Sequence, residues 1–146
     1  MGLVAEILAV KGSRVQTIEP GATVLDAIKQ MVESNVGSIV VVDGETIRGI
    51  FTERDYLRRI VIEGRTSKTT PVRDVMTAEL VCTDPARSIE DCMAVMTQKR
   101  IRHLPVLDGG RLVGIVSIGD LVKSLSKERE IEIRYLTDYI SGKYPG

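Results

Sequence analysis

The sequence predicts an α+β fold made of two pseudo-symmetric β-α-β-β-α units that pack sheet to sheet. The first observation is an internal repeat, because residues 21–60 align with residues 86–125 without a gap, at an offset of 65. The second is an Asp-Gly turn between two β-branched strands in each copy. The third is a composition of 43% hydrophobic and 27% charged residues in a chain of 146, which is enough to build a core.

Each copy predicts the same five elements in the same order. A weak strand ends at a proline, a helix follows a Ser or Thr cap, two strands flank the Asp-Gly turn, and a second helix begins at another cap. In the first copy these are strand 15–18, a helix from Thr23, strands 39–42 and 47–51, and a helix from Thr52. In the second copy they are strand 80–83, a helix from Ser88, strands 104–107 and 112–116, and a helix from Ser117. We expect the two sheets to form one pseudo-symmetric core, with a cleft between the copies along their axis.

The repeat sets the domain boundaries. Residues 1–65 form the first predicted unit, 66–127 the second, and 128–146 an extended C-terminal helix and tail. The join at 63–70 is polar, and Pro71 is predicted to open a short helix containing Val72 and Val75. Val4 and Ile7 are expected to play the same part before the first copy. The last helical pattern outruns its counterpart, which predicts packing against another chain and hence a homodimer.

Composition excludes several classes of function. Lys+Arg and Asp+Glu are both 20, so no global basic field is present to hold nucleic acid or an anionic membrane. The longest strongly apolar run, 39–42, is too short to span a bilayer, and residues 1–10 do not read as a signal peptide. Cys82 and Cys92 cannot form a disulfide framework or a four-ligand zinc site, so free thiols and a cytoplasmic location are expected.

A Ser/Thr-x-x-Asp spacing at a helix start carries the predicted chemistry. A carboxylate can accept both hydrogen bonds of a vicinal diol, and the free N–H groups beside it favour phosphate. The same spacing is also a capping box, and it occurs four times, at Thr23/Asp26, Thr52/Asp55, Ser88/Asp91 and Ser117/Asp120. By spacing alone, capping is the favoured interpretation for each of them.

In each half, a longer segment contains the second of these motifs. These segments are Gly49-Ile-Phe-Thr52-Glu-Arg-Asp55 and Gly114-Ile-Val-Ser117-Ile-Gly-Asp120, together with 102–106 (RHLPV) and the linker leading into 71–77 (PVRDVMT). This pattern resembles the CBS domain pair, or Bateman module, from about Val4 to Tyr139. No enzyme domain accompanies the pair, so the chain looks like a stand-alone member.

The resemblance implies a non-catalytic regulatory or sensor module. Such modules bind an adenosyl ligand between the repeats and transmit its occupancy to a target protein. AMP, ADP or ATP are the expected ligands, NAD(H) is a further candidate, and S-adenosylmethionine is less expected. Members commonly form flat dimers, head to head or head to tail.

The resemblance also implies roles for individual residues. Asp55 and Asp120 would hold ribose hydroxyls and Thr52 and Ser117 the phosphate or ribose, which leaves Thr23 and Ser88 as plain caps. The other candidate ligand-binding residues are Arg54, Arg102 and His103 toward phosphate, Val36, Ile101, Thr70 and Val72 toward the purine, and Lys68, Ser38, Pro105 and Gly119. Lys99 and Arg100 are weaker candidates. For each charged residue the alternative is a solvated surface group, for His103 a structural histidine, and for each aliphatic residue ordinary core packing.

Two rival functions remain open at this point. The first is a constitutive interaction or scaffold protein whose clefts are vestigial. The second is an enzyme such as a nucleotide hydrolase, which has little support. Residues 64–69 lack the second glycine and the GK[ST] ending of a phosphate loop, and His103 has no evident nucleophile partner.

Overall fold

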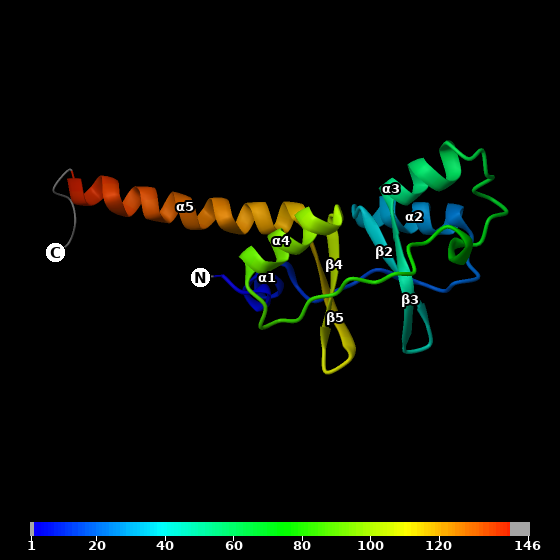
Figure 1. Ribbon diagram of the computed structural model, residues 1–146, viewed down its shortest axis with the longest axis horizontal. Coiled ribbons are helices and arrows are strands. Elements are labelled where there is room, and N and C mark those ends of the chain that lie inside the picture. Colours follow the sequence, from blue (N-terminus) through cyan, green and yellow to red (C-terminus); the bar gives the residue numbers. More distant parts are fainter. Residues whose placement is uncertain (1, 141–146) are drawn as a thin grey trace.

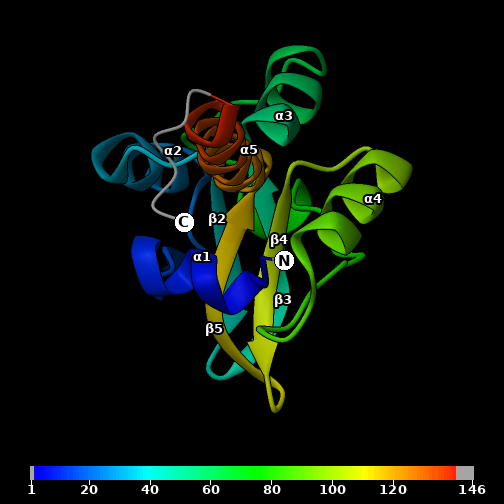
Figure 2. The ribbon, with the colours of Figure 1, turned by 90° about the vertical axis from the view of Figure 1, so that its left-hand side faces the viewer.

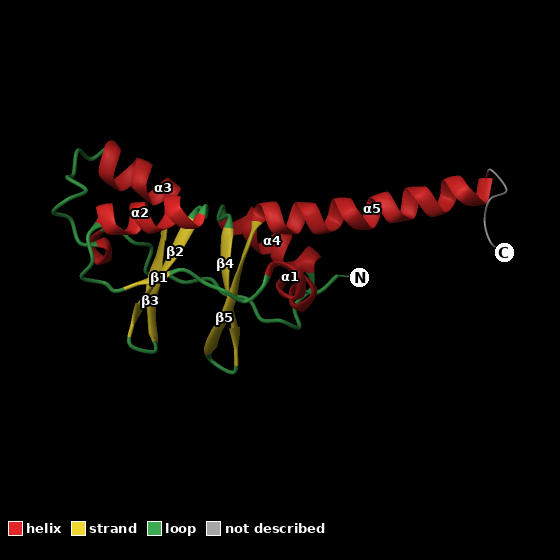
Figure 3. Ribbon diagram, turned by 180° about the vertical axis from the view of Figure 1, so that it is seen from behind, coloured by secondary structure: helices red, strands yellow, loops and turns green. Residues whose placement is uncertain are grey.

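The computed structural model describes residues 2–140, and it contains two small sheets with helices on their outer sides (Figures 1 and 3). Viewed along the long axis, the sheet of β4 and β5 lies in front of the sheet of β2 and β3 (Figure 2). The predicted α+β architecture of two units that pack sheet to sheet is therefore confirmed.

The described elements follow the predicted order in both units. The first unit contains β1 (Thr17–Ile18), α2 (Val24–Ser34), β2 (Ser38–Asp43), β3 (Thr46–Thr52), α3 (Glu53–Asp55) and the π-helix η1 (Tyr56–Val61). The second contains α4 (Ile89–Lys99), β4 (His103–Asp108), β5 (Arg111–Ser117) and α5 (Ile118–Ile140). Two short connecting elements are α1 (Val4–Lys11) and the 3-10 helix η2 (Val72–Asp74).

The two hairpins repeat each other in detail. β2 pairs antiparallel with β3, and β4 with β5, and each pair has one register shift, at Val41/Val42 and at Val106/Leu107. These shifts lie 65 residues apart, so the repeat reproduces the local irregularity as well as the strands. Both Asp-Gly turns place their first glycine at positive φ, 63° at Gly44 and 58° at Gly109.

The predicted strands 15–18 and 80–83 are shorter than expected. β1 pairs with β2 over two residues, whereas Thr83 makes only an isolated parallel bridge to Val106, so the second sheet has two strands. In the first unit the Val40 amide donates to the Gln16 carbonyl at 3.0 Å. Its repeat counterpart is Pro105, which has no amide hydrogen, and this missing donor explains the lost strand.

Among the residues that the structure describes, the hydrophobic core forms two clusters, which corrects the expectation of one shared core. Their membership does not follow chain order. Val4 and Ile7 of α1 lie in the cluster of the second unit, while Val72 and Val75 of the linker complete that of the first. Backbone bonds hold both segments, with Val4 N–H donating to Arg87 O at 2.9 Å and Val72 N–H to Ala22 O at 2.8 Å. The predicted boundary at residue 65 thus separates the two repeats along the sequence. In space, however, the segment with Val4 and Ile7 belongs to the second unit, and the segment with Val72 and Val75 belongs to the first.

The facing sides of the sheets are also shielded from water. Ile39 and Val41 belong to the cluster of the first unit, so Val40 between them points to the opposite face of the sheet, where it is fully buried. Pro105 occupies the same position in β4 and is buried as well. Each sheet therefore buries an apolar side chain on the side away from its own cluster.

Candidate functional site

Two clefts lie between the units, one around each repeated Asp. The first cleft, around Asp55, has a volume of about 690 Å³, and the second cleft, around Asp120, about 670 Å³. Each takes one wall from a helix start in one unit and the other from the segment before a strand in the opposite unit. Gly37 and His103 line both clefts, so the two cavities adjoin at the pseudo-axis.

All four predicted caps are formed. The hydroxyls of Thr23, Thr52, Ser88 and Ser117 accept hydrogen bonds of 3.1–3.2 Å from the backbone N–H of the Asp three residues later. Of these motifs, only Thr52/Asp55 and Ser117/Asp120 line a cleft. Capping and cleft lining therefore coexist in those two motifs, and the capping interpretation alone describes Thr23 and Ser88.

The carboxylate of Asp55 is held by neutral donors. Its Oδ2 accepts from the Thr52 backbone N–H at 3.0 Å and from the Thr52 hydroxyl at 3.1 Å, and its Oδ1 accepts from the Thr77 hydroxyl at 3.0 Å. A carboxylate has about four acceptor sites, so a further donor can bind, and both hydroxyls can also turn toward a ligand.

The carboxylate of Asp120 is instead held by a cation. Its Oδ2 accepts from the Ser117 backbone N–H at 2.8 Å and from the Lys11 ammonium at 2.7 Å. Burial acts to raise the pKa of Asp120, but the bonds from Lys11 and Ser117 outweigh it and leave this pKa below the ordinary value. Asp120 is therefore ionised at neutral pH and already neutralised by an internal partner.

The two clefts differ in charge. The first cleft is lined by five basic residues against three acidic ones, and the second by two basic and two acidic ones. Arg54 of the first unit also reaches across the mouth of the first cleft, where its Nη1 donates to the Arg100 carbonyl at 3.0 Å. The first cleft therefore offers the more favourable potential for several negative charges.

The structure sorts the predicted site residues into three groups. The first cleft contains Thr52, Arg54, Asp55, Ile101, Arg102, His103 and Pro105, together with the weaker candidates Lys99 and Arg100. The second cleft contains Val36, Ser38, His103, Ser117 and Asp120. Lys68, Thr70, Val72 and Gly119 do not line either cleft. Val36 and Ile101 are repeat counterparts, so the predicted purine wall is divided between two sites.

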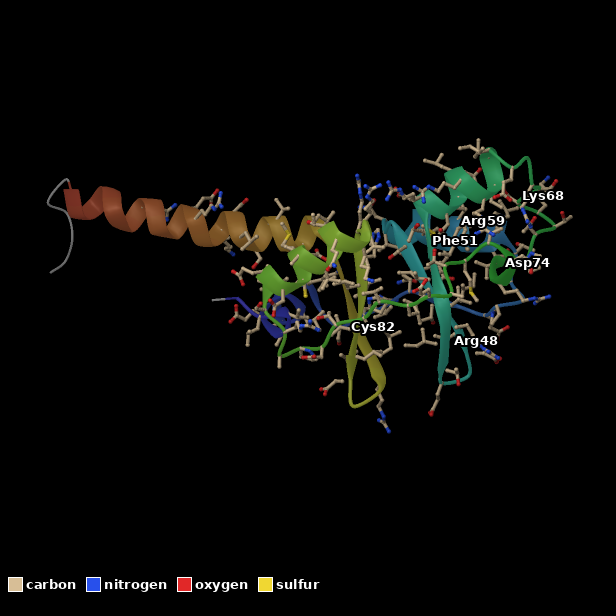
Figure 4. All side chains as sticks on the ribbon, viewed as in Figure 1. Arg48, Phe51, Arg59, Lys68, Asp74 and Cys82 are labelled. Carbon is tan, nitrogen blue, oxygen red and sulfur yellow. The ribbon has the colours of Figure 1, made fainter. Side chains whose placement is uncertain are left out.

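The four predicted residues outside the clefts are kept there by packing or by their place in the chain. Val72 is fully buried in the cluster of the first unit, and Thr70 is buried beside it, its carbonyl accepting from the Val24 N–H at 2.9 Å. Lys68 is exposed in the linker, at the end of the molecule far from the second unit (Figure 4). Gly119 is exposed on the first turn of α5, outside the second cleft.

The sequence predictions missed Lys11, Thr77 and Arg58. Arg58 lies one helical turn after Asp55, and that spacing could have indicated it. Lys11 and Thr77 come from the segments that precede the repeats, outside the gap-free alignment at an offset of 65. Their positions depend on the pairing of those segments with the units, which no local signal specifies.

His103 lies where the two clefts meet. Its Nε2 would lie 3.3 Å from a Cβ added at Gly37, so glycine leaves the space that the imidazole occupies. Burial lowers the pKa of His103 below its ordinary value, the charges of Lys11 and Arg102 act in the same direction, and Asp120 opposes them. The imidazole is therefore neutral at neutral pH.

Acidification from about pH 8 to about pH 5 is expected to destabilise the protein through His103. The unfolded chain binds a proton near the ordinary pKa of 6.5 while the folded chain resists it, so the free energy of unfolding falls as the pH drops from there through the folded pKa. Urea denaturation at a series of pH values measures this slope. His103→Gln should flatten it in that range, and an unchanged slope would contradict the assignment.

A duplicated half-domain with facing sheets and a cleft on each side of the axis defines a tandem CBS-type module. Residues 4–62 and 72–127 match the family model described as CBS domain, so the chain belongs to the CBS domain family and carries a pair of these domains. This confirms the resemblance stated from the sequence.

Known proteins share both the sequence and the fold. The chain is 45% identical over 127 residues to the mitochondrial CBS domain-containing protein CBSX3 of Arabidopsis thaliana, covering 84% of this chain and 62% of that protein's length. A solved protein with CBS domains from Burkholderia ambifaria MC40-6 is 50% identical, with a TM-score of 0.82 over 85% of this chain and 93% of that one.

A more distant structure shares the fold. It is the CBS domain pair of protein MJ0100, solved with 5′-methylthioadenosine and S-adenosyl-L-methionine, which is 21% identical, with a TM-score of 0.78 over 88% of this chain and 98% of that one. Within residues 2–140 of the present chain, no helix is both long and apolar enough to cross a membrane.

Proposed function

We propose that this chain is a non-catalytic regulatory module that binds an adenine nucleotide in the first cleft, with ATP or ADP favoured over AMP and NAD(H). The observation that carries the proposal is the placement of the Asp55 carboxylate and five basic residues around one cleft of about 690 Å³. A carboxylate suits a ribose diol, and a surplus of cations suits a chain of phosphates.

The contacts around Asp55 support a sugar at this position. Its three neutral hydrogen-bond donors leave the negative charge of the carboxylate uncompensated by any nearby ammonium or guanidinium in the described contacts. Hydrogen bonds to a charged group contribute roughly 1.5–3 kcal/mol, so a diol bound here would add substantially to affinity.

The aliphatic part of the first cleft suits a flat apolar base. Ile50, Val81, Ile101 and Pro105 line the first cleft, and they offer aliphatic surface without an aromatic partner. Protein MJ0100, which shares the fold, was solved with two adenosyl ligands, and this makes adenine the first base to test.

Transmission to a partner follows from the position of the cleft. Because the first cleft has walls from both units, a ligand that binds it changes the free energy of their association, as Arg54 already does by bonding to the Arg100 carbonyl.

The target protein and the homodimer through α5 are part of this proposal. The last helical pattern of the sequence depends partly on Ile133, Leu136 and Ile140, whose side chains lie outside the described residues. Cytoplasmic location also stays a prediction, since the Arabidopsis relative is named as mitochondrial.

Isothermal titration with ATP, ADP, AMP and NADH tests the proposal. We expect ATP to bind most tightly and Asp55→Asn to weaken it about tenfold or more, which corresponds to about 1.4 kcal/mol. Asp26→Asn is the matched control, because Asp26 belongs to the same kind of capping box but lines no cleft. No heat with any nucleotide would favour the scaffold function, and turnover of ATP on incubation would favour an enzyme.

A further inference from the structure

Lys11 forms an ion pair with Asp120, whose carboxylate lies in the second cleft. Its Nζ lies 2.7 Å from Asp120 Oδ2 and 2.8 Å from the carbonyl oxygen of Ile115. Both side chains of this ion pair are largely covered, with exposed fractions of 33% for Lys11 and 25% for Asp120. The pair forms because α1, at the beginning of the chain, packs on the second unit and ends at the cleft.

The first cleft has no equivalent cation at this position. Val4 and Val72 donate to Arg87 and Ala22, which are repeat counterparts, so the segments before the two copies correspond at an offset of 68 and the counterpart of Lys11 is Glu79. Glu79 is acidic and lines the first cleft, and the Asp55 carboxylate meets the Thr77 hydroxyl instead of a cation. The two clefts therefore present similar carboxylates in opposite states, one open to a neutral diol and one already paired.

A neutral sugar cannot replace this pairing on its own. Hydrogen bonds from a ribose diol could satisfy Asp120, but the displaced ammonium would lose its carboxylate inside a partly buried site. A ligand with its own anion can compensate both groups, since the diol takes the carboxylate and the anion takes the ammonium. The bond to Ile115 O would keep the ammonium at the wall of the cleft during this exchange.

We propose that Lys11 is the specificity-determining residue of the second cleft, and that this cleft selects a nucleoside monophosphate over an uncharged nucleoside. The proposal rests on the proposed function, because it assumes that the carboxylate of a cleft binds ribose. The balanced charge of the second cleft, two basic and two acidic residues, favours one phosphate group over a polyphosphate chain.

The test compares AMP with adenosine by isothermal titration in an Asp55→Asn background, which weakens the first cleft. Without a further change, AMP should bind more tightly than adenosine. Adding Lys11→Met should raise adenosine affinity and lower AMP affinity, so that the ratio of the two falls about tenfold or more. Lys11→Gln, which keeps a neutral donor, should give an intermediate ratio and serves as a second variant if Lys11→Met is unstable.

Two controls isolate the second cleft. Lys29→Met removes an exposed lysine of α2 that lines no cleft, and it should leave the ratio unchanged. Asp55→Asn combined with Asp120→Asn measures the binding that remains in the first cleft.

The outcomes separate this inference from the proposed function. If Lys11→Met does not change the ratio of AMP affinity to adenosine affinity, the role of Lys11 is overturned. If the unmodified protein does not bind ATP, the proposed function is overturned instead. If neither ligand binds the second cleft even after Lys11→Met, that cleft is not a nucleoside site and the inference is also overturned.

Discussion

Replacing Phe51 with alanine is expected to lower the free energy of unfolding by about 3–5 kcal/mol, the cost of removing a large buried ring and leaving a cavity. Phe51 is fully buried on β3, where it belongs to the same cluster as Val24 of α2 and Val72 of the linker (Figure 4). It thus joins segments that are distant in the chain, and the surrounding backbone cannot collapse to refill the space.

Urea denaturation followed by circular dichroism measures this change. Val61→Ala is the control, because Val61 is 56% exposed and lies outside the cluster, so its loss should change stability by about 0.5 kcal/mol or less. A loss below about 1 kcal/mol for Phe51→Ala would mean that the linker does not seal the core of the first unit.

Replacing Gly49 with alanine is expected to cost about 1–3 kcal/mol, because the added methyl group would collide with backbone. A Cβ at Gly49 would lie 2.6 Å from the Thr77 carbonyl oxygen and 2.8 Å from Met76 Sδ. That carbonyl accepts from the Ile50 N–H at 3.0 Å, while the Thr77 N–H donates to the Ile50 carbonyl at 2.8 Å. Relieving the collision would therefore break two backbone hydrogen bonds.

Gly114→Ala is the matched control in the other repeat. A Cβ there would lie 2.6 Å from Leu8 Cδ2, but this atom ends a flexible side chain that can turn aside. Neither glycine has positive φ, so alanine also restricts the unfolded chain and offsets part of the cost. Thermal and urea denaturation should show a clear loss for Gly49→Ala and a change near zero for Gly114→Ala, and equal losses would contradict this account.

The Gly49 variant also connects stability with the candidate site. The Thr77 hydroxyl donates to Asp55 Oδ1, so a shift of Thr77 would disturb the carboxylate of the first cleft. We therefore expect Gly49→Ala to weaken nucleotide binding as well. Gly49 thus allows the linker segment to pass close to β3. Asp55, six residues later, accepts a hydrogen bond from Thr77 of that segment.

Local signals predicted much of the candidate site. The Ser/Thr-x-x-Asp spacing placed Asp55 and Asp120 at helix starts, and the repeat indicated that both face the junction of the units. Arg54, Arg102 and His103 were expected near phosphate and do line the first cleft. The sequence pattern could not tell Val72, a core residue, from a residue of the purine wall, because both roles require an aliphatic side chain beside a turn.

The order of amino acids alone specified the duplicated unit, its caps and hairpins, and the two carboxylates, because each of these depends on residues close together in the chain. It also contained the reason for the missing strand, since a proline without an amide hydrogen stands where Val40 donates in the first unit. Only the folded arrangement decided that α1 completes the second unit, that Lys11 neutralises Asp120, and that the two clefts differ in charge. Those features depend on contacts between distant segments, whose energies are set by packing of the whole chain rather than by any local pattern.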